Sequence, residues 1–168
     1  SDPSDPDVVA ATTIDGELQR CGLQCDSGES AKTVFEGFHI TNCTGGYLKG
    51  GITLENSGPT IRNCIVDNNS SQYNGSGIIC NNSDATITNC RITNNMNMDY
   101  LYPGGGLAVV PISDEYVSEA AFPTIRNTIF CGNFPNAILG KWIDGGGNCI
   151  AFLCDDNDGD GLPDECQG

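Results

Sequence analysis

FEGFHITNC, residues 35–43, is the first of four related nine-residue stretches that decide how this chain folds. The other three are IRNCIVDNN at 61–69, ITNCRITNN at 87–95 and IRNTIFCGN at 125–133. The first two steps between them are 26 residues each, and the third is 38, so one unit carries insertions. A repeat of this length is one supersecondary unit that stacks on its neighbours. The sequence therefore predicts a repeat architecture.

The spacing of apolar residues within the unit predicts the kind of repeat. Positions 0, 3 and 5 are apolar or small, as in Ile61, Cys64 and Val66. The step from 3 to 5 is strand alternation, whereas the step from 0 to 3 breaks that alternation and requires a bend. The bend position holds residue types that tolerate positive φ: Gly37, Asn63, Asn89 and Asn127. We therefore expect a parallel β-solenoid in which Ile61, Ile87 and Ile125 form one inward column.

Three phrases also carry a resemblance to a known family: GPTIRNC at 58–64, ATITNC at 85–90 and GGGL at 104–107. They resemble the repeats of right-handed parallel β-helices, the pectate-lyase-like superfamily, over residues 33–150. The resemblance implies an all-β fold, a right-handed parallel β-helix of about four to five coils. This scaffold hosts lyases, glycosidases, adhesins and structural fibres alike, so it implies no particular chemistry.

The pattern divides the chain into three parts. Residues 1–32 form an N-terminal tail whose segment 8–14 has strand composition, and we expect this segment to cap the first coil or to be donated to another copy. Residues 33–150 form the β-helix, and residues 151–168 form a C-terminal loop flanked by cysteines. The insertions place longer loops at 96–103 and 112–122.

The C-terminal tail holds one chemical motif, D-x-D-x-D-G-x-x-D, which runs from Asp156 to Asp164. Carboxylates at alternate positions converge on a hard cation, the glycine permits a sharp turn, and the seventh residue offers its carbonyl oxygen. The motif resembles the calcium loops of EF-hands, dockerins and thrombospondin type 3 repeats. The predicted cofactor is calcium, and its predicted ligands are Asp156, Asp158, Asp160, Leu162, Asp164 and Glu165.

The motif departs from its relatives at the twelfth position, where Gln167 replaces a bidentate carboxylate. We expect Glu165 or a water molecule to complete the coordination shell. The alternative is a solvated acidic tail. Against that alternative, six carboxylates lie within residues 155–165, and they repel one another unless a cation neutralises them.

Ten cysteines in 168 residues indicate an oxidising, extracellular location. We expect the disulfide partners among the cysteines outside the inward columns, with Cys154 and Cys166 closing the calcium loop. Those outside the columns are Cys21, Cys25, Cys131, Cys149, Cys154 and Cys166. Cys64 and Cys90 are neighbours in one inward column, about 4.8 Å apart. This distance permits a bond, but disulfide geometry is strict, and small buried hydrophobes are the alternative.

Charge and residue placement exclude several functions. The net charge of −15 disfavours nucleic acid and anionic membranes as partners, because both require a basic surface. No apolar run approaches the ~18 residues of a membrane span. No column unites a basic residue with paired carboxylates, so we expect no enzymatic activity. The isolated candidates considered were His39, Lys49, Arg62, Asp67, Arg91 and Arg126.

The ends of a short solenoid suggest its role. Each terminal coil exposes apolar side chains and unpaired backbone groups, which must be covered by the chain itself or by another copy. We expect a secreted structural protein that self-associates head to tail, and a self-capped monomer is the alternative. A carbohydrate-binding or adhesive module that uses the loop at 112–122 is a second role, and a polysaccharide lyase or glycoside hydrolase is a third.

Overall fold

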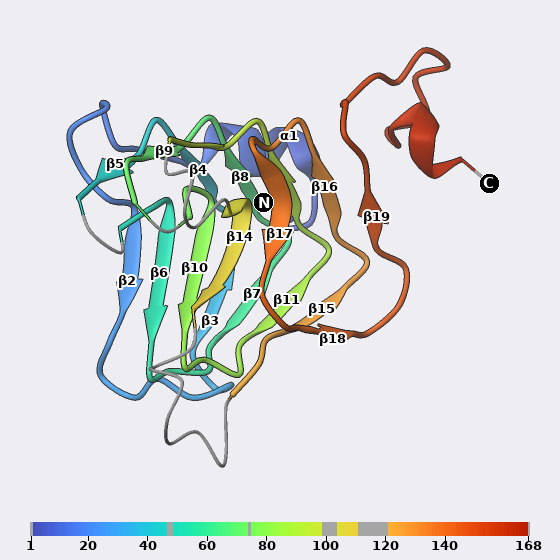
Figure 1. Cartoon of the computed structure of the whole chain (residues 1–168). Coiled ribbons are helices and arrows are strands. Elements are labelled where there is room, and N and C mark those ends of the chain that lie inside the picture. The colour runs from blue at the N-terminus through green and yellow to red at the C-terminus, as the bar shows by residue number, and fades with distance from the viewer. Residues whose placement is uncertain (1, 47–48, 74, 99–103, 111–120, 168) are drawn as a thin grey trace.

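Short parallel strands stack into a solenoid whose axis runs from left to right in Figure 1. The structure is a computed structural model and describes residues 2–46, 49–73, 75–98, 104–110 and 121–167. Four sheets, named A to D here, contain the described strands, and every pairing between those strands is parallel. Sheets B and C have five strands each, which matches the upper end of the predicted coil number.

Each sheet receives its strands from successive coils. Sheet A contains β1 (Thr13–Asp15), β4 (His39–Thr41), β8 (Ile65–Asp67), β12 (Arg91–Thr93), β16 (Ile129–Cys131) and β19 (Cys149–Ile150). Sheet B contains β2 (Leu23–Cys25), β6 (Ile52–Glu55), β10 (Ile78–Asn81), β14 (Gly104–Val110) and β17 (Asn136–Leu139). Sheet C contains β3 (Val34–Glu36), β7 (Thr60–Arg62), β11 (Thr86–Thr88), β15 (Thr124–Arg126) and β18 (Ile143–Asp144). Sheet D contains β5 (Thr44–Gly45), β9 (Ser70–Ser71) and β13 (Met96–Asn97).

The predicted inward column is confirmed. Ile61, Ile87 and Ile125 lie opposite one another in sheet C, and all three are fully buried. The predicted bend residues adopt positive φ, with values of 73° at Gly37, 53° at Asn63 and Asn89, and 47° at Asn127. Asparagine or glycine occupies this corner in these four coils because other residues are strained in the left-handed region.

An asparagine ladder runs along the core. The Asn69 amide donates to Oδ1 of Asn95 at 3.0 Å, and the Asn95 amide donates to Oδ1 of Asn133 at 3.1 Å. Each side chain also bonds backbone groups of neighbouring coils, such as the 2.9 Å contact from Asn95 Nδ2 to the Val66 carbonyl. Because buried polar groups need partners, the ladder fixes the register between coils as well as stabilising them.

Two expectations about the N-terminal part are wrong. The solenoid begins with β1 and β2, about twenty residues before the expected boundary at 33, since these strands pair with β4 and β6. Within the segment 8–14, residues up to Ala11 belong to helix α1 (Pro6–Ala11) instead of a strand. Local signals favour this helix, because Asp5 caps its N-terminus and Pro6 occupies its first turn.

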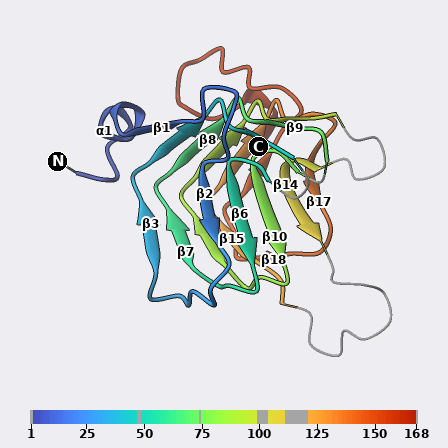
Figure 2. The same ribbon diagram turned by 90° about the vertical axis from the view of Figure 1, so that its left-hand side faces the viewer.

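Helix α1 lies beside the coils instead of across their end. Figure 2 shows α1 outside the coil, next to β1. Val9 is the buried residue of the helix, and β1 is the outermost strand of its own sheet A. In this structure β1 and β2 therefore pair within the chain's own solenoid.

Two further observations bound the fold. Residues 111–120 lie outside the described residues, and they include most of the loop at 112–122 for which carbohydrate binding was considered. In the part of the chain that the structure describes, no helix is long and apolar enough to cross a membrane.

The ladder generates a stability prediction. Asn95→Ala removes a fully buried amide that bonds Asn69, Asn133 and Val66, and leaves their polar groups unsatisfied. We expect a loss of about 3 kcal/mol or more in the free energy of unfolding, measured by urea denaturation. The exposed Asn136→Ala in β17 is the control and should change stability by less than about 0.5 kcal/mol. Equal, small effects from both substitutions would show that the ladder does not stabilise the fold.

Candidate metal centre and end surfaces

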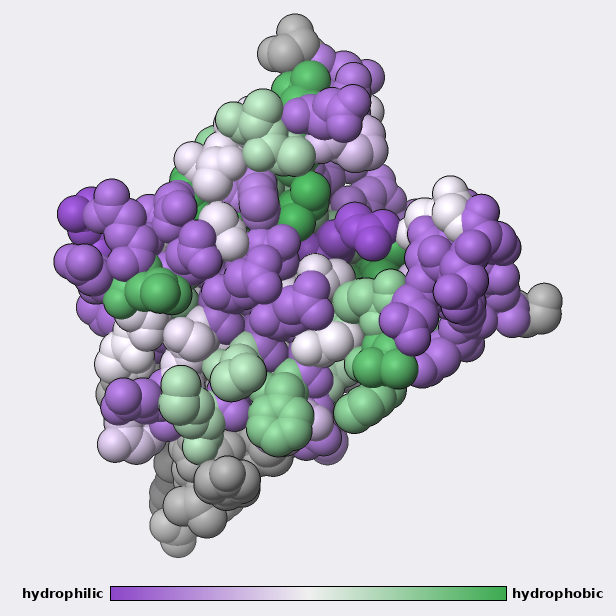
Figure 3. All heavy atoms as spheres, turned by 90° about the horizontal axis from the view of Figure 1, so that it is seen from above, coloured by the Kyte–Doolittle hydropathy of each residue, from purple (hydrophilic) through white to green (hydrophobic). Residues whose placement is uncertain are grey.

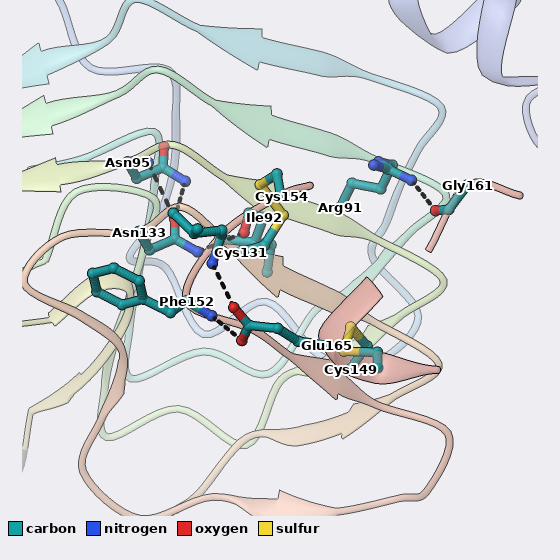
Figure 4. The surroundings of a disulfide bond; sticks show 12 residues. Arg91, Ile92, Asn95, Cys131, Asn133, Cys149, Phe152, Cys154, Gly161 and Glu165 are labelled. Atoms are coloured by element: carbon teal, nitrogen blue, oxygen red, sulfur yellow. Dashed lines mark hydrogen bonds between the residues drawn. A yellow bond between two sulfur atoms is a disulfide. The ribbon is translucent and has the colours of Figure 1, made fainter. Parts of the chain in front are cut away.

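Two disulfides fasten the C-terminal tail to the outer face of sheet A. Cys131 bonds Cys154, and Cys149 bonds Cys166 (Figure 4). The expected Cys154–Cys166 bond is therefore wrong. Cys131 and Cys149 belong to the adjacent strands β16 and β19. Side chains alternate between the two faces of a strand, and each cysteine is next to a residue of the inward column, so both cysteines project outward.

The two bridges hold both ends of residues 155–165, which carry the acidic motif. Cys154 precedes this segment and Cys166 follows it, and each is bonded to a separate strand of the solenoid. Figure 3 shows the hydrophilic C-terminal segment projecting at the right of the molecule. Of the remaining cysteines, Cys21 and Cys25, which were expected to form disulfides, are unbonded.

Three of the predicted calcium ligands come together in this segment. Carboxylate oxygens of Asp156, Asp158 and Asp164 lie within 4.8 Å of one another. The Asp156 carboxylate accepts hydrogen bonds from the backbone of Gly159 at 2.8 Å and Gly161 at 2.9 Å. Gly161 has a φ of 89°, so it supplies the turn that the motif requires at this position.

Gln167 and Glu165 lie differently from what the sequence suggests. Gln167 donates from Nε2 to Oδ1 of Asp158 at 3.1 Å and of Asp160 at 3.3 Å. The hydrogen bond from Gln167 to Asp158 is the largest of the effects that lower the pKa of Asp158. Glu165 instead accepts hydrogen bonds from the backbone N–H of Phe152 at 2.9 Å and of Leu153 at 3.4 Å (Figure 4).

Glu165 therefore stabilises the start of the tail, and the side chain at the twelfth position reaches the acidic cluster. Rotating the Gln167 amide by half a turn would exchange its nitrogen for its oxygen at the same place, and amide oxygens are calcium ligands. The donors of the cluster are all oxygens, a set that suits a hard divalent cation better than a soft one. Leu162 lies at the predicted seventh position, where its backbone N–H donates to Asp160 at 2.8 Å.

One contact ties this segment to the middle of the solenoid. Arg91, in β12, donates from Nη1 to the carbonyl oxygen of Gly161 at 2.8 Å (Figure 4). In the sequence, Arg91 is an isolated basic residue with no evident partner. Its role depends on the return of the tail over sheet A, which no local pattern encodes.

His39 and Asp67, considered separately in the sequence, are partners in the structure. His39 Nε2 lies 2.8 Å from Asp67 Oδ1, and both side chains are largely buried on the outer face of sheet A. Arg62 pairs with Glu36 at 2.7 Å along sheet C. These contacts link successive coils. In the ranges that the structure describes, the only group of three or more histidine, cysteine or acidic side chains that could hold a metal ion is the three aspartates of the tail.

The terminal coils leave three sheets open at each end. The first strands β1, β2 and β3 pair on one side only, as do the last strands β19, β17 and β18. On the outward face of sheet C, one column is threonine in its interior and apolar at its two ends. It reads Val34, Thr60, Thr86, Thr124, Ile143. Val34 is 43% exposed and Ile143 is 53% exposed.

Comparison with known proteins gives one family. The model of the family described as "Right handed beta helix region" matches residues 11–150. This range includes β1 and β2, in agreement with the early start of the solenoid. No curated protein and no solved structure matches the chain.

The anchoring of the tail generates a prediction about the disulfides. Replacing Cys131 and Cys154 together with serine removes a crosslink that closes a loop of 23 residues. We expect the free energy of unfolding to fall by about 3 kcal/mol, because the unfolded chain gains freedom. Thermal and urea unfolding of the non-reduced proteins measure this change. The Cys21→Ser variant is the control, since Cys21 is unbonded. An unchanged stability of the double variant, with the wild-type bridge verified by mass spectrometry, would contradict the prediction.

Proposed function

The chain belongs to the right-handed β-helix family, and from this premise we propose that it is a secreted, non-catalytic structural solenoid whose copies stack head to tail. In this proposal, calcium bound by the C-terminal tail and the two disulfides stabilise the last coils. Ten cysteines support an oxidising location.

The single observation that carries the proposal is the threonine column that turns apolar at both ends. Val34 and Ile143 stand at positions that are threonine in every interior coil. In a head-to-tail stack, β18 of one copy lies beside β3 of the next, and these two side chains become neighbours. Their burial contributes about 1 kcal/mol each, since about half of each side chain is exposed in the single copy.

The sheet topology supports the same contact. Sheets B and C each run from a first-coil strand to a fifth-coil strand, so one translation of five coils continues both. Sheet A has a sixth strand, β19, at the level that β1 of the next copy would occupy, so the stack requires β19 to be displaced. Ile150 ends the inward column of Phe130, and Ile14 begins it. The contact joins two different surfaces, so it produces an open filament when the rotation does not close a ring.

One residue departs from this apolar pattern. Asp144 occupies the inward column of Ile125 at the last coil. Its carboxylate accepts hydrogen bonds from the Gly146 backbone and the Asn148 amide, both at 2.8 Å, and so its charge is compensated within its own copy. An inward-pointing charge is one of the features by which edge strands oppose pairing with another chain, so Asp144 counts against stacking at the edge of sheet C.

The calcium site supports the end surface because of where its tail is attached. The disulfides join the tail to β16 and β19, and Arg91 joins it to β12. An ion that orders residues 155–165 therefore stabilises the coils that carry Ile143 and Ile150. Binding to the folded state alone contributes about 2.7 kcal/mol at an ion concentration 100 times the dissociation constant.

A polar cleft favours carbohydrate binding as a second candidate function. The cleft has a volume of about 360 Å³ and lies at the bends that follow β2, β6 and β10. Its lining includes Glu29, Ser30, Asn56, Asn82 and Asp84. Carboxylates and amides bind sugar hydroxyls, although the lining lacks an aromatic platform among the described residues. A glycan array tests this candidate, and assembly without glycan binding separates the two functions.

The stacking proposal predicts the effect of charges at the two sheet edges. Ile143→Lys should weaken self-association by about tenfold, because it replaces an apolar contact with a desolvated charge. The variant with both Ile143→Lys and Val34→Glu should recover association, since opposite charges then meet across the junction. Sedimentation and electron microscopy of the full chain with calcium measure both. Thr86→Lys, in the interior of the same column, is the control and should assemble like the wild type. A wild-type chain that stays monomeric at high concentration with calcium would refute the proposal.

The calcium site predicts opposite effects for two neighbouring residues. Gln167→Glu should raise calcium affinity by about tenfold, because it supplies a bidentate carboxylate at the twelfth position. Glu165→Gln should change the affinity little, since this carboxylate bonds the backbone of Phe152 and Leu153. Titration calorimetry of the intact, disulfide-bonded protein measures both. The absence of binding at millimolar calcium in the wild type and in Gln167→Glu would reduce the motif to an acidic tail.

A further inference from the structure

Cys64 and Cys90 are two buried thiols that neither the disulfides nor the proposed function uses. They stand at the same corner of adjacent coils, between sheets C and A. The register is fixed on both sides of them, because Arg62 pairs with Thr88 and Ile65 pairs with Arg91. The backbone N–H of Arg91 donates to the Cys64 carbonyl at 2.9 Å, so the two cysteines lie directly above one another.

This stacking brings the two residues within the range of a disulfide. Neighbouring strands lie about 4.8 Å apart, and the Cα atoms of bonded cysteines lie about 4.4–6.8 Å apart. The column continues to Phe38 on one side and Thr128 on the other, so the pair has no third sulfur beside it. Cys80, another fully buried thiol, belongs to sheet B and lacks such a partner in its column, which contains Leu54 and Val109.

A cleft reaches Cys64 from outside. It has a volume of about 310 Å³ and separates the N-terminal segment, through Pro6 and Val9, from the bend that holds Asn63, Cys64 and Asn89. Cys90 does not line the cleft and lies behind Cys64. Figure 3 shows the N-terminal and C-terminal segments as separate projections with a recess between them. Cys64 thus borders the cleft, with 1% of its surface exposed, and Cys90 lies directly behind it.

We propose that Cys64 and Cys90 form a reactive dithiol that a small-molecule disulfide oxidises to a third disulfide, which staples two adjacent coils. Cys64 is the attacking thiol because it lines the cleft, and Cys90 is the resolving thiol because it lies directly behind Cys64. The reactivity of the two groups agrees with this order. The hydrogen bond from the Cys90 thiol lowers the pKa of Cys64, whereas the same contact, together with burial, raises the pKa of Cys90.

The exchange balances as two displacements. The Cys64 thiolate attacks one sulfur of the small disulfide, whose S–S bond breaks and whose other sulfur leaves as a thiolate. The Cys90 sulfur then attacks Sγ of Cys64 in the mixed disulfide, forms the Cys64–Cys90 bond and expels the second small thiolate. The two protons lost by the cysteines are taken up by the two released thiolates. The protein dithiol is oxidised, and one small disulfide is reduced to two thiols.

Oxidised glutathione tests the proposal on the folded, full-length protein. After incubation, the sample is quenched with acid, alkylated in denaturant and cleaved on the amino side of aspartate. Cleavage before Asp67 and Asp84 places Cys64, Cys80 and Cys90 in three separate peptides. Mass spectrometry should then find the Cys64 and Cys90 peptides joined, and Cys80 alkylated. Burial raises the pKa of Cys80 to about 12, so it is the matched unreactive thiol.

Variants assign the two roles. In Cys90→Ser the reaction should stop at a glutathione adduct on Cys64, and in Cys64→Ser the Cys90 thiol should be recovered unmodified. Cys80→Ser should form the Cys64–Cys90 bond as the wild type does, and circular dichroism checks that each variant folds. Recovery of both cysteines as free thiols in the folded wild type, which needs no variant, would overturn the proposal. A glutathione adduct that accumulates on Cys90 would overturn the order of attack.

Discussion

Register between neighbouring coils is the constraint on which the rest of this structure depends. The described strands are only two to seven residues long, so none is stable without a neighbouring coil. The buried amides of Asn69, Asn95 and Asn133 bond one another and the backbone of adjacent coils, and a slip of one residue would leave them unsatisfied. Once the register is set, every column of side chains is set with it, including the isoleucines of the core, the bend residues and the cysteine pair at positions 64 and 90.

The periodic part of this fold could be predicted because each coil repeats the same local solution. Asn63 and Asn89 mark one bend, and Ile61 and Ile87 mark one inward column, so the pattern reports backbone conformation and burial together. The N-terminal part could not be predicted as well. Strand-forming residues at 8–11 follow Asp5 and Pro6, and a helix cap of this kind overrides weak strand propensity.

The candidate metal site likewise has a part that the sequence predicts and a part that it does not. The spacing of Asp156, Asp158 and Asp164 predicts their convergence, because a glycine turn between them is local. The disulfides and the Arg91 contact depend on the path by which the tail returns over sheet A, and cysteines near in sequence were a poor guide to that path. Gln167 looked like the weak point of the motif, yet its amide is the side chain that reaches the acidic cluster, whereas Glu165 bonds elsewhere. The role of the twelfth residue depends on the direction in which its side chain points, and the spacing of residues in the motif does not give that direction.

The open ends connect the fold to the proposed function. Each interior strand of sheets A, B and C pairs with a strand on both sides, but in the part of the chain that the structure describes each terminal strand pairs on one side only. Val34 and Ile143 replace threonine where a neighbouring copy would cover them, and the tail reinforces the last coils through β16 and β19. Electron cryo-microscopy of the full-length protein assembled with calcium tests this account most directly. The account predicts continuous sheets B and C across each junction, with β18 of one copy beside β3 of the next. Single copies, or copies joined along their sides, would contradict it.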